Sequence, residues 1–173
     1  VNPADASQQL LNIPKSRLYG AEAELTVRPS DAFTLHAGLG LLSTKIKTGI
    51  VSGVNVSGNR LSNAPSLTFN ASFDWTVLET GFGAFSVHPE MAYQSSQFFE
   101  NINVPRLRQE SYALFGGHVD WNSSDGRYSL SAWARNLGNK FYFTSRIDLT
   151  GFGLDYNHIG NPRMYGVTAG VKF

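Results

Sequence analysis

The stretch Tyr165-Gly-Val-Thr-Ala-Gly-Val-Lys-Phe173 decides the fold class of this chain. Its apolar residues are Tyr165, Val167, Ala169, Val171 and Phe173, and every residue between them is small or polar. A two-residue period of this kind is the signature of a β-strand with one apolar face and one polar face. The stretch therefore predicts a strand whose two faces meet different surroundings.

Six segments further upstream show the same alternation. They are 17–27, 33–41, 66–75, 85–94, 113–121 and 128–135. The clearest is 66–75, where Leu67, Phe69, Ala71, Phe73 and Trp75 alternate with polar residues. The segments are close to the roughly 9 to 11 residues that a tilted strand needs to cross a bilayer. Strands of globular proteins usually have about 5 or 6.

The composition excludes several classes of function. The 14 Lys and Arg residues nearly balance the 13 Asp and Glu residues, so no general field for nucleic acid or another polyanion is expected. Cys is absent, which excludes disulfides and thiolate metal sites. No apolar run approaches the roughly 20 residues of a membrane-spanning helix. The chain is therefore expected to be either soluble or a β-barrel of a membrane.

The connections favour the membrane barrel. Short connections at 29–32, 76–81 and 122–127 alternate strictly with long ones at 44–65, 95–111 and 147–162. Outer-membrane barrels alternate short periplasmic turns with long extracellular loops in this way. Aromatic residues beside the short connections or the terminus are typical of an interfacial girdle; they are Phe33, Trp75, Trp121, Tyr128 and Phe173.

Seven strands are an odd number. A bacterial single-chain barrel has an even number of strands and both ends in the periplasm. A sheet of seven would leave unpaired edges in lipid, so we expect at least one further strand upstream of residue 1. The opening residues Val1-Asn-Pro-Ala contain no initiator Met, which fits a C-terminal fragment of a longer chain.

Four motifs, in family order, resemble the C-terminal part of TonB-dependent outer-membrane receptors. They are Asn12 followed by Tyr19-Gly-Ala-Glu-Ala-Glu24, then Gly58-Asn-Arg-Leu-Ser-Asn-Ala-Pro65, then Trp133-Ala-Arg-Asn-Leu137 with Lys140 and Tyr142, and finally Gly160-Asn-Pro-Arg-Met-Tyr-Gly-Val167 through Phe173. Gly138-Asn139 departs from the family pattern, which usually has an acidic residue after Asn-Leu. Together the motifs cover nearly the whole chain.

The resemblance implies an all-β fold, a transmembrane antiparallel β-barrel of 22 strands. Residues 1–173 would form its last seven strands, and the plug domain, the TonB box and the upstream strands would lie outside this chain. The implied function is active uptake of a scarce nutrient, such as a ferric siderophore, energised through TonB. The implied location is the bacterial outer membrane, as a multi-pass protein in contact with lipid and with the barrel-insertion machinery. No enzyme activity and no cofactor are implied.

Two sets of residues are candidate sites. The terminal apolar set of Tyr165, Val167, Ala169, Val171 and Phe173 resembles the signal that the insertion machinery recognises. The long connections mix aromatic and cationic side chains, which suits an anionic aromatic ligand such as a ferric chelate. These candidate ligand contacts are Phe98, Phe99, Arg106 and Arg108 in one connection and Arg146, Tyr156 and His158 in another. The alternative is that they are ordinary loop and girdle residues.

Other polar residues are assigned no chemistry. Glu22 and Glu24 share the lumenal parity, and we expect them to bond waters or the plug rather than to act in catalysis. His36, His88 and His118 share that parity too, but they lie on different strands without the spacing of metal ligands, so no metal site is expected. We therefore predict neither catalytic nor metal-binding residues.

Two alternatives to the receptor stay open at this stage. One is a passive porin or another outer-membrane barrel, such as an adhesin, whose upstream strands lie outside the chain. The other is a soluble β-sandwich that binds carbohydrate, because the strands of a sandwich alternate as well. An intact barrel would require detergent and would migrate differently on gels before and after boiling, whereas a sandwich would do neither.

Overall fold

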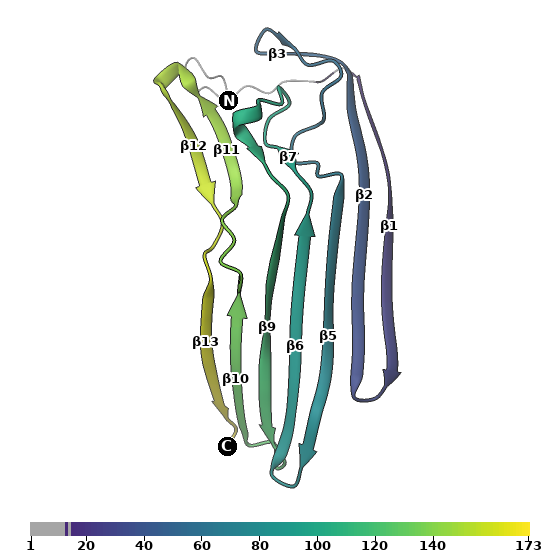
Figure 1. The fold of residues 1–173 in the computed structure, drawn as a ribbon, viewed down its shortest axis with the longest axis vertical. Helices are drawn as coiled ribbons and strands as arrows, with labels where there is room; N and C mark the ends of the chain where they lie inside the picture. The colour runs from purple at the N-terminus through teal and green to yellow at the C-terminus, as the bar shows by residue number, and fades with distance from the viewer. Residues whose placement is uncertain (1–12, 14) are drawn as a thin grey trace.

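Seven long strands pair in chain order to form one antiparallel sheet, as the computed structural model shows (Figure 1). The structure describes residue 13 and residues 15–173; Asn12 of the first motif lies outside them. The strands are β1 (Lys15–Ser30), β2 (Phe33–Thr48), β5 (Leu67–Thr80), β6 (Gly83–Gln94), β9 (Tyr112–Ser123), β10 (Tyr128–Arg135) and β13 (Met164–Val171). Each of the seven expected segments is one of these strands, so the prediction of strand number and position is confirmed.

The smaller elements all lie in the long connections. They are β3 (Ile50–Val51), β4 (Val54–Asn55), β7 (Gln97–Phe98), β8 (Arg108–Gln109), β11 (Phe143–Leu149), β12 (Leu154–Ile159) and the 3-10 turns η1 (Pro105–Leu107) and η2 (Thr150–Phe152). The short strands pair as β3 with β4, β7 with β8 and β11 with β12. Figure 1 shows them together at one end of the sheet, with the short turns at the other end. The described residues contain no helix long and apolar enough to cross a membrane.

Three of the expected boundaries were wrong. The chain stays in strand β5 through Thr80, so the short turn there is 81–82 rather than 76–81. A bulge between Thr76 and Leu78 allows this extension, because it takes up one residue while pairing with β6 continues. Strand β2 likewise runs on to Thr48. The last long connection begins at residue 136 instead of 147 and contains the β11–β12 hairpin.

The register of the sheet keeps apolar and polar side chains on opposite faces. Directly opposed residues of paired strands share a face. One row across six strands is entirely apolar: Phe33, Trp75, Val87, Val119, Ala132 and Val167. A nearby row on the other parity is entirely hydroxylic or acidic: Thr76, Ser86, Asp120, Ser131 and Thr168. The alternation within each strand thus becomes an apolar face and a polar face for the whole sheet.

Trp75 keeps the position expected of a girdle residue although β5 is longer than expected. It lies inside β5 rather than beside a turn, but it pairs with Phe33 at the start of β2. The backbone N–H of Thr76 donates to the carbonyl of Ala32, 2.8 Å away. Trp75 is therefore level with the β1–β2 turn, and the β5–β6 hairpin extends beyond that level (Figure 1).

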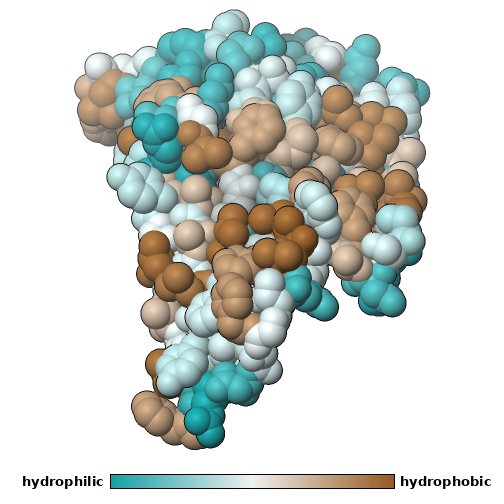
Figure 2. Space-filling view, turned by 60° about the horizontal axis from the view of Figure 1, so that its bottom comes forward, coloured by the Kyte–Doolittle hydropathy of each residue, from teal (hydrophilic) through white to brown (hydrophobic). Residues whose placement is uncertain are grey.

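The buried core lies in the long connections and at the adjoining end of β2, where Ile46 is buried, and not along the middle of the sheet. The buried apolar residues are Ile46, Val56, Ala64, Phe99 and Leu107. On the sheet, large apolar residues such as Val167 stay exposed, and Figure 2 shows apolar patches open at the surface. Within residues 13 and 15–173, no second sheet packs face to face on the seven strands. A soluble β-sandwich requires that second layer, so this alternative is wrong.

The two faces predict opposite responses to charge at neighbouring positions. Ala71 lies on the apolar face, opposite Ala37 and Met91, and Asn70 lies on the polar face, opposite Gly38. Ala71→Arg should lower the free energy of unfolding in a bilayer by about 2 to 4 kcal/mol, because the guanidinium would be in contact with hydrocarbon. Asn70→Arg should cost far less. Denaturant titration of the refolded barrel in liposomes measures both variants, and equal costs would contradict a lipid-facing apolar side.

Candidate functional site

The three long connections, 49–66, 95–111 and 136–163, contact one another and form what we call the loop cap. The first two are joined by amide side chains. The Asn59 side chain donates to the carbonyls of Asn101 and Ile102, each 2.9 Å away. The Asn103 side chain accepts from the Arg60 N–H and donates to the Arg60 carbonyl, again at 2.9 Å. Such bonds fix one connection on the other because they satisfy backbone groups that no strand pairs.

The second and third connections are joined by an ion-pair network at Arg106. Its guanidinium lies 2.6 Å from Asp148, and it also forms a two-point contact with Asp155 at 3.1 and 3.2 Å. Glu100 supports the network by accepting from the Asp148 N–H at 2.9 Å. Fork-like contacts of arginine with carboxylates define geometry as well as charge. Arg106 therefore fixes η1 against the β11–β12 hairpin.

The network shifts the ionisation of its members. Hydrogen bonds to Asp155 and Asp148 raise the pKa of Arg106. Burial raises the pKa of Asp148, but hydrogen bonds from Thr150 and the contact with Arg106 outweigh it, so the pKa of Asp148 is lowered overall. Because the pKa of Asp148 in the folded protein lies below the ordinary pKa of Asp, the charged Asp148 stabilises the loop cap fully at any pH above that ordinary pKa. This stabilisation is lost as the pH falls through the lowered pKa.

Gln109 and Arg146 complete the junction. Gln109 is buried, and its side-chain oxygen accepts from the Phe143 N–H at 2.7 Å. The guanidinium of Arg146 lies 4.2 Å from the centre of the Phe143 ring and donates to Asn157 at 2.6 Å and to the Arg108 carbonyl at 3.3 Å. The loop cap is thus held by polar contacts between residues far apart in the sequence.

All seven candidate ligand contacts lie in the loop cap. Phe99 is buried, Phe98 is half-buried and Tyr156 is exposed. Arg108 pairs with Glu110 at 3.3 Å and with the Ser96 hydroxyl at 2.9 Å, and the His158 ring bonds the Thr144 hydroxyl at 2.6 Å. The structure therefore gathers the predicted aromatic and cationic groups, with protein partners on each cation. Their role in ligand binding stays a prediction.

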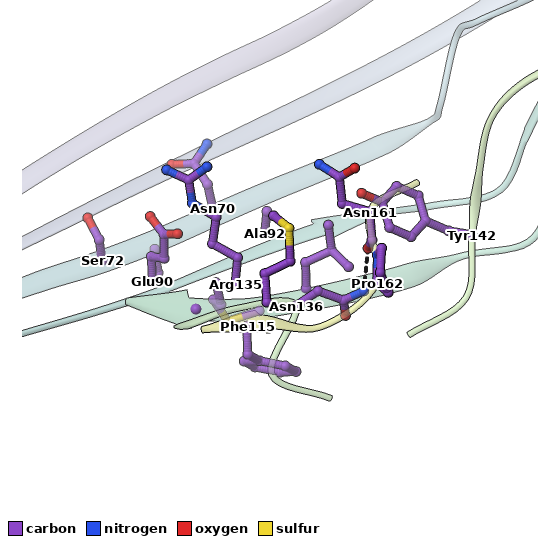
Figure 3. A pocket seen from close by; sticks show the side chains of 15 residues that line it. Asn70, Ser72, Glu90, Ala92, Phe115, Arg135, Asn136, Tyr142, Asn161 and Pro162 are labelled. Atoms are coloured by element: carbon purple, nitrogen blue, oxygen red, sulfur yellow. Dashed lines mark hydrogen bonds between the residues drawn. The ribbon is translucent and has the colours of Figure 1, made fainter. Parts of the chain in front are cut away.

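A hollow of about 450 Å³ lies beside the loop cap (Figure 3). Asn70, Glu90 and Arg135 line it from three different strands, and Tyr142 lines it from the last connection. Gly116 leaves room there, since a Cβ at this position would lie 3.0 Å from a carboxylate oxygen of Glu90. A carboxylate, a guanidinium and amides in one hollow can bond a polar group. The sequence did not predict this hollow, because residues from several strands form it.

Asn136 closes the hollow where β10 ends. It is buried and has a φ of 48°, in the left-handed region. Its side chain donates to the carbonyl of Asn161, 2.9 Å away (Figure 3). It also donates to the carbonyl of Lys140 at 2.9 Å and accepts from the Lys140 N–H at 2.8 Å. The Asn-Leu motif seen in the sequence thus has a structural explanation: it ends the strand and ties both ends of the last connection together.

The three lumenal-parity histidines lie closer together than their sequence spacing suggested. His88 is directly opposite His118 on the neighbouring strand, and a carboxylate oxygen of Asp74 lies 3.6 Å from the ring of His36. Glu22 and Glu24, by contrast, are exposed on β1 and stand opposite Gly40 and Gly38. Sequence reasoning missed the histidine cluster because only the register of the sheet brings these strands together.

The family model described as TonB dependent receptor-like, beta-barrel matches residues 1–137. This chain belongs to that family. Three solved structures have a fold similar to that of this chain. The ferric yersiniabactin uptake receptor FyuA of Yersinia pestis has a TM-score of 0.77 at 18% identity, over 91% of this chain and 24% of that chain.

Two further receptors resemble this member of the family in fold. The siderophore receptor PiuA of Acinetobacter baumannii has a TM-score of 0.72 at 20% identity, over 89% of this chain and 21% of that chain. The ferripyoverdine receptor of the Pseudomonas aeruginosa outer membrane has a TM-score of 0.66 at 18% identity, over 91% of this chain and 20% of that chain. The chain therefore spans about a quarter or less of these receptors, and the match supports a section of a barrel.

Receptors of the TonB-dependent family are outer-membrane β-barrels, which gives the two faces of this sheet their surroundings. In such barrels the apolar parity faces lipid and the polar parity faces the lumen. The hollow and the histidines of this family member are therefore lumenal. The loop cap lies at the end where the family has its long extracellular loops.

The predicted insertion signal lies on an edge of the sheet. Within the described residues, β13 pairs only with β10. Tyr165, Val167, Ala169 and Val171 lie on one face, opposite apolar residues or Tyr128 of β10. Phe173 lies two residues beyond the end of the strand at Val171 and is exposed. A free edge with an apolar face is suited to strand addition, and recognition by the insertion machinery stays a prediction.

Two replacements of Asn136 should distinguish the stability that its side-chain hydrogen bonds contribute from the cost of its left-handed backbone conformation. Asn136→Ala removes three hydrogen bonds and leaves a Cβ in the left-handed region, so we expect a loss of about 2 to 4 kcal/mol of folding free energy. Asn136→Gly removes the same bonds without the backbone strain and should cost about 1 kcal/mol less. Denaturant titration in detergent compares the two. Two variants as stable as the wild type would contradict the structural role.

Arg106→Gln should loosen the loop cap without altering the sheet. With the ion pairs gone, the Asp148 N–H should exchange with deuterium several-fold faster, while the amides of β6 keep their wild-type rates. Arg28→Gln is the matched control, because it breaks only the exposed Arg28–Asp31 pair of a short turn. Hydrogen exchange read by mass spectrometry measures all three proteins. Unchanged exchange at Asp148 would show that Arg106 does not hold the cap.

The wild-type loop cap should also open in acid. Because the pKa of Asp148 is lowered, the protection of its amide, which is the slowing of its exchange relative to an unstructured peptide at the same pH, should stay high from neutral pH down to about pH 4, the ordinary pKa of Asp. The protection should fall only at lower pH, as the carboxylate takes up a proton. A loss of protection that began near pH 6 would mean that another group controls the opening.

Proposed function

We propose that this chain is the C-terminal wall section of a receptor that imports a ferric siderophore, or a chemically similar scarce nutrient, across the bacterial outer membrane. The observation that supports this best is family membership over most of the chain, combined with an antiparallel sheet that has seven long strands in chain order. The similar structures are described as a ferric yersiniabactin uptake receptor, a siderophore receptor and a ferripyoverdine receptor. Energy for uptake would come from TonB, through a part of the receptor outside this chain.

The domain proposal is that residues 1–173 supply the last seven of 22 barrel strands. Unpaired backbone groups cannot remain in hydrocarbon, so the free edges of β1 and β13 require neighbouring strands in the membrane. A sheet of seven long strands has an apolar face that no other described element covers. The missing strands and the surrounding lipid would satisfy both needs, and a plug domain would lie against the polar face.

In this proposal each part of the chain has a physical task. The sheet supplies wall and lumen surface, and the loop cap contributes to recognition at the outside. Tyr156 and Phe98 supply aromatic surface in the loop cap, and Phe98 lies opposite Arg108. With Arg106 and Arg146 of the same cap, this mixture suits a planar anionic chelate once the loops rearrange and free the arginines from their present partners. The family is one of transport receptors, so the chemistry required is binding and release, with no covalent step.

Uptake by cells tests the proposal. A strain without the receptor gene should lose accumulation of its radioactive ferric siderophore, and the restored gene should recover it. The same strain without functional TonB should bind the chelate at its surface but accumulate none. Accumulation that is independent of TonB would favour the passive porin. A receptor that binds no ferric chelate from a broad panel would overturn the siderophore assignment.

A further inference from the structure

Two histidines and an aspartate converge on the lumenal face of β6 and β9. His88 and His118 are directly opposed across the two strands, and their rings stack with centroids 4.3 Å apart at an angle of 13°. Asp120 lies two residues beyond His118 on the same face. One of its carboxylate oxygens is 3.5 Å from Nε2 of His88 and 3.3 Å from Nε2 of His118.

These distances are close to those of a coordination shell. A tetrahedral zinc ion with ligands at about 2.0 to 2.1 Å has ligand atoms about 3.3 Å apart. The two contacts of Asp120 have nearly that length, and one ligand atom from each of the three residues lies within 4.8 Å of the others. The stacked rings hold their in-plane lone pairs nearly parallel, so the rings would have to tilt out of the stack for all three ligand atoms to surround a single ion.

Asp74 gives His88 the orientation of a metal ligand. One of its carboxylate oxygens lies 2.5 Å from Nδ1 of His88. This bond assigns the proton of a neutral ring to Nδ1 and leaves the lone pair of Nε2 facing Asp120. A carboxylate behind the ligating ring is the usual second partner of metal-bound histidine. The second oxygen of Asp74 lies 3.6 Å from the ring of His36.

The arrangement brings two acceptors together in the neutral state. The lone pair of His88 and the carboxylate of Asp120 face each other at 3.5 Å, while the Ser86 hydroxyl can donate to His88 at 3.1 Å and the His118 ring can donate to Asp120 at 3.3 Å. A cation between them removes this repulsion. The side chains of His88 and Asp120 are 23% and 22% exposed and that of His118 is 44% exposed, so an ion can enter from the lumen.

We propose that His88, His118 and Asp120 bind one divalent transition-metal ion on the lumenal face of the barrel wall. Imidazole with a carboxylate suits zinc and its neighbours in the first transition row, with a fourth position open to water. The ion would cross-link β6 and β9. This site lies apart from the loop cap, on other residues, and goes beyond the proposed uptake function.

Zinc titration of the purified receptor that contains this chain tests the site. The protein in detergent is freed of metal, and Zn²⁺ alone is added in a calorimeter. The wild type should bind one more ion than His118→Ala and one more than Asp120→Asn. Asp74→Asn should keep the ion with about 10- to 100-fold weaker affinity, because Asp74 only orients a ligand. His158→Ala, a histidine of the loop cap, should bind zinc like the wild type.

The mobility of unboiled samples on gels shows which variants are assembled, and the two ligand variants provide independent tests if one fails to fold. Identical zinc binding by wild type, His118→Ala and Asp120→Asn would overturn the proposal and assign the cluster to ion pairs between protonated imidazoles and carboxylates. Binding of the ferric chelate, measured on the same preparations, is a separate readout. Loss of zinc binding with chelate binding intact would therefore leave the uptake function standing.

Discussion

The structure depends on one constraint: every backbone N–H and C=O that lies in hydrocarbon must find a partner within the protein. In the described residues, pairing in chain order from β1 to β13 meets this constraint along most of the sheet. The exceptions include the two outer edges, the bulge between Thr76 and Leu78, and Pro89 of β6, which has no N–H to donate. The constraint requires long strands, which leave the polar connections only at the ends of the sheet. It also requires a fixed register, because a slip of one residue would turn every apolar side chain of a strand to the lumen. The apolar rows across the sheet are the visible result.

Alternation revealed the strands because it arises within each strand and needs no partner. The segment 66–75 therefore located β5 from its sequence alone, and the strict order of short and long connections indicated a barrel. The bulge between Thr76 and Leu78 escaped detection, since it depends on pairing with β6. The β11–β12 hairpin could have been recognised from alternation too, because Phe143, Ile147 and Leu149 of β11 all lie on the same parity. Sequence reasoning placed these residues outside any strand and so overlooked the hairpin.

The contacts within the sites could not be foreseen in this way. A long connection joins β6 to β9, so no tight turn fixes their register, and nothing local places His88 opposite His118. The same holds for Arg106, whose partners Asp148 and Asp155 lie on a hairpin far along the chain. Sequence reasoning identified Arg106 as a cation available to a ligand, whereas the structure shows it already paired. In both clusters, side chains that look isolated in the sequence find partners of opposite charge or complementary hydrogen bonding.

The most direct test of this account is the environment of consecutive residues along β5 in the intact receptor. Nitroxide labels placed one at a time from Leu67 to Trp75, in a lipid bilayer, report collisions with oxygen in lipid and with a water-soluble nickel complex. The account predicts a two-residue period, in which Leu67, Phe69, Ala71 and Phe73 favour oxygen and the residues between them favour nickel. Equal accessibility on both parities, or a period near 3.6 residues, would contradict a barrel wall with one face in lipid and one in the lumen.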